Sequence, residues 1–416
     1  MVSVTKDSIP AVRFEGFEGA WAHCDLNQVG AKSTATNTDS ALTETFTNSA
    51  QYGVISQLEY FDHSVSNPAN ISKYSVVEPD DFVYNPRISV RAPFGPINRN
   101  RLARSGAMSP LYLVFKVFGV DHSFLEQFFK TDRWYRFMRL NGDVGARHDR
   151  FSISDTKFME MKIPTPALEE QRAIGKLFSD LDTLIEQQRA KHANLQQTKT
   201  ALLQRMFPQD GADEPELRLD GFSGAWGAKS LKNLGSSYGG LTGKTKEDFG
   251  HGDARYITYL DVFERALIDD GSRLGITEID NRQNEVKTGD VLFTVSSEVP
   301  EEVGMSAVWL GQGQSIYLNS FCFGFRPIAE LDSKFLAYVL RSPDFRDKMT
   351  LLAQGISRFN ISKIRAMELE IFFPAIEEQR AIGEVFSNLD ALISAEARYI
   401  TQLTQAKTAL LQRMFV

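Results

Sequence analysis

The chain has 416 residues, which at about 100–200 residues per domain predicts two to four domains. Hydrophobic residues make up 42% of the sequence and charged residues 24%, which is typical of a globular protein and excludes a disordered chain. The net charge of −7 argues mildly against a nucleic-acid partner, but the charge is unevenly distributed. With no long apolar run, no signal-peptide pattern and no paired cysteines, we expect a cytoplasmic protein without membrane contact or a cysteine zinc site.

Residues 1–163 are predicted to form a first globular module of the α+β class. Short apolar strands, such as residues 81–84 and 111–117, alternate with loops rich in Gly, Pro, Asn and Asp, and a helix is predicted over residues 123–139. Between residues 82 and 150, twelve Lys and Arg stand against five acids. Such a local excess is typical of a surface that follows a phosphate backbone, although a solvated face balanced by acids elsewhere is the alternative.

Residues 164–207 are predicted to form one long helix. Its apolar residues recur at steps of four and three from Ile174 to Met206, which is the heptad pattern of a coiled-coil seam with polar layers in its middle. Pro166 suits the start of this helix. Residues 208–216 carry four acids, two prolines and no base, and are predicted to form an exposed linker.

The rest of the chain repeats this plan. Residues 217–371 are predicted to form a second α+β module, with strands at 290–294 and 321–325 and a helix at 332–353. Residues 372–416 repeat the long helix at an offset of 208, and roughly 26 of 42 positions are identical. The interiors of the two modules show little similarity. Two matched seams predict two modules separated by a pair of long antiparallel coiled-coil helices, related by an internal pseudo-twofold repeat, with Phe415 returning to the first module.

Five polar positions are identical in both copies of the helix, and this repetition indicates that the same partner docks twice. The alternative to docking is a recent duplication that has not diverged. For the paired helices as a whole, a spacer that sets the distance between the modules is weighed against a duplicated helical hairpin that only stabilises the fold. The repeated residues are Gln171, Arg172, Lys199, Gln204 and Arg205 in the first copy, and Gln379, Arg380, Lys407, Gln412 and Arg413 in the second.

The sequence contains no convincing catalytic or metal-binding motif. Residues 239–245 resemble a phosphate-binding loop, but Tyr238 stands where that motif requires glycine. The six histidines form no close pair of the kind that binds zinc. We therefore predict no catalytic residue and no metal ligand in this chain.

Two divergent modules, each followed by a repeated P-x-x-E-E-Q-R helix that ends in L-L-Q-x-M-F, resemble the specificity subunit of type I DNA restriction–modification enzymes. The resemblance covers essentially the whole chain, and its motifs lie at residues 84–87, 166–172, 202–207, 288–293, 374–380 and 410–415. It implies that each module is a target recognition domain for one half of a split double-stranded DNA sequence. It also implies that the paired helices set the gap between the halves and dock two methyltransferase subunits.

The same resemblance implies that this chain is not an enzyme and holds no cofactor. S-adenosylmethionine, ATP and magnesium would belong to the methyltransferase subunits and to the motor-nuclease subunits that complete the complex. A free-standing DNA-binding regulator and a coiled-coil protein-interaction scaffold are the alternative functions.

Candidate DNA contacts follow from the basic residues and from the matching ends of the modules. Arg150 and Arg358 stand at equivalent places, where each would hold a backbone phosphate or cap the junction with the helix. The second module is less basic than the first, so its reading would depend more on Asn, Gln, Ser and backbone groups. The candidates are Asn85, Arg87, Arg91, Arg99, Arg101, Arg147 and Arg150 in the first module, and Lys244, Lys246, Arg255, Arg358 and Asn360 in the second.

Overall fold

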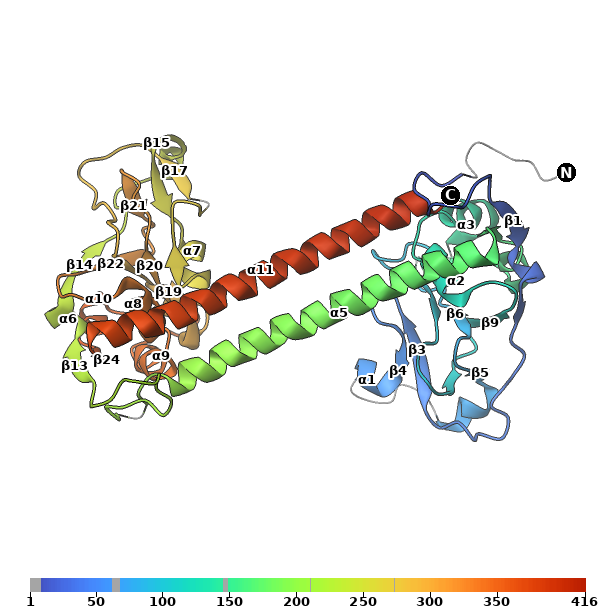
Figure 1. Cartoon of the computed structure of the whole chain (residues 1–416), viewed down its shortest axis with the longest axis horizontal. Helices are drawn as coiled ribbons and strands as arrows, with labels where there is room; N and C mark the ends of the chain where they lie inside the picture. Colours follow the sequence, from blue (N-terminus) through green and yellow to red (C-terminus); the bar gives the residue numbers. More distant parts are fainter. Residues whose placement is uncertain (1–8, 62–67, 145–148, 210, 273) are drawn as a thin grey trace. The chain divides into compact units, whose positions relative to one another are not determined.

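The computed structural model describes residues 9–61, 68–144, 149–209, 211–272 and 274–416. The chain divides into two compact units, residues 1–189 with 399–416 and residues 190–398. Two long helices, α5 (Leu168–Arg205) and α11 (Ile376–Met414), each contribute to both units (Figure 1, green and red). Each unit is therefore a module of mixed helices and strands combined with parts of both long helices.

The first unit is built on two four-stranded sheets, with strand orders β2-β9-β6-β7 and β4-β3-β8-β5. Two further antiparallel pairs join β1 to β12 and β10 to β11. The strands are β1 (Ala22–Asp25), β2 (Gly30–Lys32), β3 (Thr45–Ser49), β4 (Gly53–Ser56), β5 (Ser75–Val77), β6 (Phe82–Tyr84), β7 (Ile97–Arg99), β8 (Gly106–Met108), β9 (Leu113–Val117), β10 (Asp143–Val144), β11 (Phe151–Ser152) and β12 (Lys162–Thr165). The shorter helices are η2 (Leu26–Gln28), α1 (Gln57–Phe61), η3 (Pro68–Lys73), α2 (His122–Phe129), α3 (Tyr135–Asn141) and α4 (Asp155–Phe158).

Apolar residues cover both faces of the sheet that contains β6. Phe82 and Tyr84 lie in one hydrophobic cluster with residues of α2, whereas Val83 lies in a second cluster with Phe46 of β3. All three residues of β6 are buried, because successive side chains of a strand point to opposite faces and each face is covered here. The segment that leaves β6 at Asn85 therefore starts from a well-anchored strand.

The C-terminal end of α11 is part of the core of the first unit. Phe415 is buried, and its ring centroid lies 6.1 Å from that of Trp21, 5.2 Å from Phe124 and 6.3 Å from Phe178. Burial of one Phe side chain contributes roughly 1.5–3 kcal/mol to stability. The prediction that Phe415 returns to the first module is confirmed.

The second unit contains a five-stranded sheet, β14-β22-β18-β20-β16, and a three-stranded sheet, β17-β15-β21. Antiparallel pairs also join β13 to β24 and β19 to β23. The strands are β13 (Gly227–Ser230), β14 (Gly235–Gly239), β15 (Phe249–Ile257), β16 (Leu267–Ile268), β17 (Gly275–Thr277), β18 (Val291–Thr294), β19 (Ser296–Ser297), β20 (Ser306–Trp309), β21 (Ile316–Leu318), β22 (Cys322–Pro327), β23 (Phe359–Asn360) and β24 (Glu370–Phe373). The shorter helices are α6 (Leu231–Leu234), η4 (Lys246–Asp248), α7 (Tyr259–Glu264), η5 (Pro300–Glu302), α8 (Ser333–Val339), α9 (Pro343–Thr350) and α10 (Lys363–Ala366).

The two units are closed by the same ion pair at corresponding places. Arg13 pairs with Glu170 of α5 at 2.6 Å in the first unit, and Arg218 pairs with Glu378 of α11 at 2.8 Å in the second. Both carboxylates are almost fully buried, at 1% and 2% side-chain exposure. Each guanidinium donates through two nitrogens to both oxygens of its carboxylate, which is the strongest geometry for such a pair.

The predicted heptad seam is confirmed, because the seam positions of both helices are buried or half-buried. Its polar layers contain ion pairs: in the second unit Lys191 pairs with Glu396 at 2.8 Å and Lys199 with Asp390 at 2.5 Å. The order of these partners shows that the two helices run antiparallel there. In the first unit, Lys407 pairs with Asp182, and this pair is related to Lys199–Asp390 by the 208-residue offset.

Two helices that were predicted as continuous are each divided in two. Residues 123–139 form α2 and α3, because α2 ends at Phe129 and the hydroxyl of Thr131 donates back to the Phe128 carbonyl. Residues 332–353 form α8 and α9. The division falls at Pro343, whose ring favours a first helical position and forces the preceding Ser342 into an extended conformation.

Candidate nucleic-acid interface

Buried side-chain amides hold the loop that leaves β6. Asn85 donates to the backbone carbonyl of Asn48 and accepts from the backbone N–H of Arg87. Asn48 in turn donates to the Val83 carbonyl and accepts from Asn98. Because buried amides require such partners, this network fixes the path of the chain after β6. Asn85, a predicted DNA contact, is therefore buried and engaged within the unit.

Backbone pairing brings Arg87 and Arg150 together. The two residues form an isolated antiparallel bridge, and the N–H of Phe151 donates to the Pro86 carbonyl at 2.8 Å. Both arginine side chains are exposed. Two predicted DNA contacts from distant parts of the sequence thus lie on one surface of the first unit.

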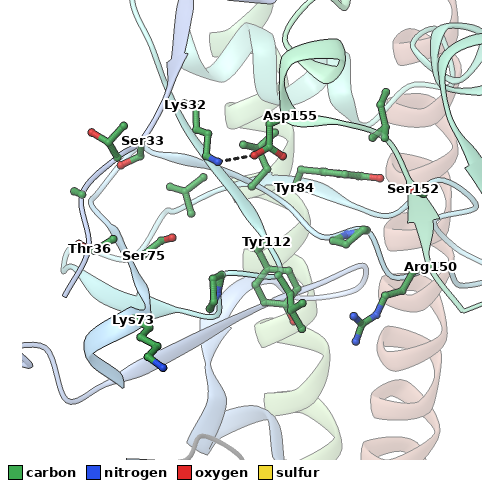
Figure 2. Close-up of a pocket in the computed structure, with 18 of the residues that line it drawn as sticks. Lys32, Ser33, Thr36, Lys73, Ser75, Tyr84, Tyr112, Arg150, Ser152 and Asp155 are labelled. Carbon is green, nitrogen blue, oxygen red and sulfur yellow. Dashed lines mark hydrogen bonds and ion pairs between the residues drawn. The ribbon is translucent and has the colours of Figure 1, made fainter. Parts of the chain in front are cut away.

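A hollow of about 550 Å³ lies on one side of this bridge, and Figure 2 shows Tyr112 between its cationic residues Lys73 and Arg150. A third cation, Lys32, pairs with Asp155 at 2.5 Å. Both partners are about half exposed, so the pair contributes little, about 0–1 kcal/mol. The lining also includes hydroxyl groups that suit hydrogen bonds to phosphate oxygens, from Ser33, Thr34, Thr36, Ser75, Tyr112 and Ser152.

A second hollow, of about 340 Å³, shares Tyr112 with the first and is lined by Arg87 and Arg91. Its described lining contains no carboxylate. The two hollows therefore form one surface on which cations outnumber carboxylates. We call this the basic surface, and its cations are Lys32, Lys73, Arg87, Arg91 and Arg150.

Arg99 and Arg101 lie in a different environment. Glu126 of α2 approaches the Arg101 guanidinium at 2.8 Å and that of Arg99 at 3.3 Å. The hollow that they line also contains Lys130, Asp182 and Glu186, so its described lining has as many carboxylates as cations. A balanced set of charges has little attraction for phosphate, and these two arginines suit DNA less well than the basic surface does. Arg147 lies outside the described residues.

The predicted DNA contacts at the start of the second module differ in whether an ion pair neutralises their charge. Lys244 pairs with Asp280 at 3.1 Å, and Asp280 also pairs with Arg282 at 3.0 Å. Hydrogen bonds from Arg282 and Lys244 hold the pKa of Asp280 well below its usual range, so the charge of Lys244 is compensated. Lys246 of η4 and Arg255 of β15 are exposed, and neither forms an ion pair with another residue that the structure describes.

Arg358 and Asn360 lie on a tight hairpin, which we call the 354–360 hairpin. Its two ends, Gln354 and Asn360, exchange backbone hydrogen bonds of 2.9 Å. Gly355 has φ +147°, and a Cβ atom there would come within 2.1 Å of the Arg358 carbonyl oxygen, so this turn requires glycine. The exposed Arg358 guanidinium lies 5.6 Å from the ring centroid of the exposed Phe321. The hairpin thus presents a cation and an amide at the surface, next to the exposed ring of Phe321.

The loop that follows β18 is acidic, whereas the loop that follows β6 is basic. Glu298 and Glu301 are exposed there. The loop is held from beneath by Arg346 of α9, which donates to the carbonyls of Glu301, Val303 and Gly304. Burial lowers the pKa of Arg346 to about 10, and its charge faces the protein interior. The arginine nearest this loop is therefore used for structure and is not available to a ligand.

The described residues contain neither a cluster suited to a metal ion nor a helix suited to a membrane span. No group of His, Cys, Asp or Glu side chains there is arranged to hold a metal ion. No helix in the same part of the chain combines the length and the hydropathy needed to cross a membrane.

A family model for the type I restriction modification DNA specificity domain matches residues 142–197 and 224–405. These segments make up more than half of the chain. The chain belongs to this family. The family assignment agrees with the resemblance in the sequence, and the matched region includes most of α5, nearly all of the second module and most of α11.

Two relatives in Methanocaldococcus jannaschii extend the family comparison. The type I restriction enzyme MjaVIII specificity subunit is 24% identical over 258 residues, which are 60% of each chain. The chain thus spans about 60% of the length of this relative. The putative MjaX specificity subunit is 21% identical over 375 residues, 86% of this chain and 77% of the relative.

Solved structures of type I restriction–modification proteins share the fold of this family member. A chain from a structure that describes complex assembly and conformational transition of the type I R-M system has a TM-score of 0.55 and 16% identity, over 97% of this chain and 99% of that one. The S subunit from M. genitalium has a TM-score of 0.51 and 13% identity, over 98% and 99%. At these identities the likeness shows the fold, which combines two mixed modules with long helices.

The repeated polar residues of the long helices fall into two groups. Gln171 and Gln379 are buried, and each donates to a proline carbonyl and accepts from the backbone N–H at the start of a packed helix. Lys199 and Lys407 form the ion pairs of the seam. These four residues are therefore repeated for a structural reason, because each binds another part of the same chain. The other six are exposed on the helix surface: Arg172, Gln204, Arg205, Arg380, Gln412 and Arg413.

The basic surface includes residues that sequence reasoning missed. Lys32 and Lys73 precede the segment with the basic excess, and they reach the hollow only because β2 and η3 pack beside it. Tyr60 and Phe61 were missed because isolated aromatic residues are usually part of a core. No signal in the sequence distinguishes these four residues from others of their type.

Proposed function

We propose that this chain is the DNA-recognition subunit of a type I restriction–modification complex, in which each unit reads one half of a bipartite double-stranded DNA target. One observation carries the proposal. The two units repeat the same internal ion pair and helix seam but present different surfaces, basic hollows in one and the 354–360 hairpin in the other. Because the repeated ion pair and seam give the two units the same internal structure, they can occupy equivalent places in one complex. Because their surfaces differ, they can bind two different half-sites.

In the first unit, the basic surface holds the phosphate backbone. Arg87, Arg91 and Arg150 approach it with exposed guanidinium groups, which bind phosphate or guanine edges through two parallel hydrogen bonds. Nearby hydroxyl and amide groups then complete the contacts. Binding by this unit is expected to weaken steeply with salt, because each phosphate contact releases counterions.

In the second unit, the 354–360 hairpin is the main contact. Arg358 and Asn360 supply a guanidinium and an amide for base edges, and Lys246 and Arg255 supply phosphate contacts. The acidic loop after β18 opposes DNA, so this unit depends on a few directed hydrogen bonds more than on a general attraction.

The long helices set the gap between the half-sites and dock two methyltransferase subunits. A helix of 38 residues is roughly 57 Å long, which is ample for such a spacer. Docking is assigned to the exposed repeated residues: Arg172, Gln204 and Arg205, with Arg380, Gln412 and Arg413. Gln171, Gln379, Lys199 and Lys407 would act indirectly, because they fix the helices in place.

The chain itself is proposed to be non-catalytic and to work in the cytoplasm. S-adenosylmethionine would be held by the methyltransferase subunits, and ATP and magnesium by motor-nuclease subunits that join for cleavage. The role of this chain is to bind and orient the DNA.

Methylome sequencing of a host that co-expresses this chain with its methyltransferase subunit tests the proposal. We expect a methylated split motif that disappears when this chain is omitted. Arg358→Ala should relax the sequence requirement in one half-site, at a cost of about 1–3 kcal/mol, whereas Arg91→Ala should weaken binding to all sequences alike.

Arg189→Ala is the matched control, because Arg189 is an exposed arginine on α5 that pairs with Glu186 of the same helix. It should leave the motif unchanged. A stable complex with an active methyltransferase but no split motif would contradict the proposal and favour a protein-binding scaffold.

A further inference from the structure

Three aromatic side chains form an exposed cluster beside the basic surface. Tyr52, Tyr60 and Phe61 are 61%, 42% and 37% exposed. The ring centroids of Tyr52 and Tyr60 lie 6.2 Å apart, and those of Tyr60 and Phe61 lie 4.6 Å apart, both in edge-to-face geometry. We call this cluster the aromatic patch. Large apolar groups gathered at a surface cost free energy in water, and they mark contact sites more often than scattered ones do.

Local structure holds the aromatic patch in place. Tyr52 lies at the turn between β3 and β4, where Gly53 adopts φ +71° and so permits the tight connection. The Gln51 side chain donates to the Tyr52 hydroxyl at 3.0 Å. Tyr60 and Phe61 lie on α1, which follows β4 directly. The patch is therefore presented by a hairpin and a helix turn of the sheet scaffold.

The surroundings of the patch indicate its partner. Tyr60 and Phe61 line the same hollow as Arg87 and Arg91, whose described lining has no carboxylate. Cations placed beside flat aromatic rings match a nucleic acid, which offers phosphates next to flat bases and sugars. An apolar protein partner would not require these two arginines, which have no ion-pair partner among the described residues.

We propose that the aromatic patch packs against the bases of the half-site that the first unit reads, and supplies the part of the affinity that salt does not weaken. This inference rests on the proposed function and deepens it. Arg87 and Arg91 hold the backbone, while Tyr60 and Phe61 contact a base-pair step, as apolar side chains do when they press into a groove. Sequences that resist opening at that step would then be bound less well.

The test measures binding of target duplexes to the complex of the full chain with its methyltransferase subunits, over a series of salt concentrations. Tyr60→Ala and Phe61→Ala should each lower the affinity roughly tenfold to hundredfold without changing the slope of affinity against salt. Tyr60→Phe should restore most of the affinity, because the ring is kept. Arg87→Ala should instead reduce the magnitude of that slope by about one.

Phe118→Ala is the matched control, since Phe118 is 54% exposed in the same unit but lines neither hollow of the basic surface. It should bind like the unaltered protein. Photo-crosslinking of a 5-iodouracil-substituted half-site, mapped by mass spectrometry, should label Tyr60 or Phe61 even if a variant folds poorly.

Two outcomes distinguish the proposed function from the role of the aromatic patch. If the unaltered complex shows no preference for any duplex, the proposed function fails. If it binds its target but Tyr60→Ala and Phe61→Ala bind equally well and no crosslink reaches the patch, only the role of the aromatic patch is overturned.

Discussion

The loops that follow β6 in the first unit and β18 in the second differ in charge although they leave similarly buried strands. The first carries Arg87 and Arg91 and has no acid up to β7, whereas the second carries Glu298, Glu301 and Glu302 and has no base up to β20. Each loop is tied to the segment that precedes a short helix, through Phe151 N–H to Pro86 in one unit and Ile361 N–H to Val295 in the other. A common frame can thus hold recognition loops of opposite charge.

This comparison shows how the chain separates stability from recognition. The repeated Arg–Glu ion pairs and the repeated Gln171 and Gln379 lie at buried junctions with α5 and α11, where a change would disturb packing. The divergent residues lie on loops and hairpins whose side chains reach the solvent, where substitution costs little stability. We call the repeated Arg–Glu pairs and the helix seam the frame. This separation can be tested by two changes in the frame, one change in a loop and one change at a position where the two units differ.

The largest effect is expected at the buried ion pair. Glu170→Ala leaves the Arg13 guanidinium without its carboxylate and also removes the acceptor of the Trp21 indole N–H, so the first unit should lose about 3–5 kcal/mol. Glu378→Ala removes the corresponding carboxylate of the second unit and leaves the Arg218 guanidinium without its partner. Denaturant unfolding, followed by fluorescence in variants that keep Trp21 or Trp226 as their single tryptophan, measures both.

In the second unit, the Trp226 indole N–H has no partner in the structure as described, so Glu378→Ala should cost less than Glu170→Ala. Equal losses from both variants would show that the indole hydrogen bond contributes nothing. Losses under about 1 kcal/mol in both would show that the pair does not stabilise the frame.

The second prediction changes the charge of a loop without changing the frame. Replacing Glu298 and Glu301 by Lys should raise the affinity of the second unit for any DNA roughly tenfold or more and steepen its salt dependence. Selectivity for its half-site should fall, because added phosphate contacts do not read sequence. Salt-dependent binding and methylome sequencing measure the two effects, and unchanged binding would mean that this loop does not face DNA.

A third, smaller effect is expected at the paired lysines of the helix seam. After Lys407→Met, Asp182 keeps an ion pair with Lys130 at 3.5 Å. After Lys199→Met, Asp390 keeps the hydrogen bond from the Tyr338 hydroxyl at 2.9 Å but has no ion pair within 4 Å among the described residues. Lys199→Met should therefore be the more destabilising of the two, at about 1 kcal/mol. Thermal unfolding of both variants tests this order, and the reverse order would contradict it.

The smallest effect concerns pH. Partial burial lowers the pKa of His23 on β1. The second unit has no histidine at the equivalent place, because β13 pairs with β24 as β1 pairs with β12 and carries Ala228 at that position. A histidine with a lowered pKa disfavours protonation in the folded state, so stability is lost as pH falls through the ordinary imidazole value of about 6.5. Between pH 7.5 and 5.5, the melting temperature of the first unit should fall slightly more than that of the second. His23→Gln should remove the difference, and its persistence in that variant would assign the effect to another group.

The sequence was sufficient to predict the repeat, both long helices and the seam, because these depend on periodicity along one segment. The prediction of one continuous helix over residues 332–353 was wrong at Pro343. Pro343 is a local signal for the start of a new helix, but the apolar pattern on both sides of it favoured a single helix. Lys32 and Lys73 could not be placed from the sequence, because only the packing of β2 and η3 brings them beside Arg150. The burial of Asn85 was equally invisible, since it depends on hydrogen bonds to Asn48, far away in the chain.

The buried Phe415 has a consequence for synthesis on the ribosome. The core of the first unit requires Met414 and Phe415, which follow the second unit in the sequence and are therefore synthesised after it. The second unit, residues 190–398, is complete in the nascent chain before that point. Because proteins usually fold from the N-terminal domain onward, this arrangement inverts the usual order in which domains become complete. Until Phe415 has been added, Trp21 and Phe124 lack the ring that packs against them, and a chaperone that shields them would be most needed during that interval.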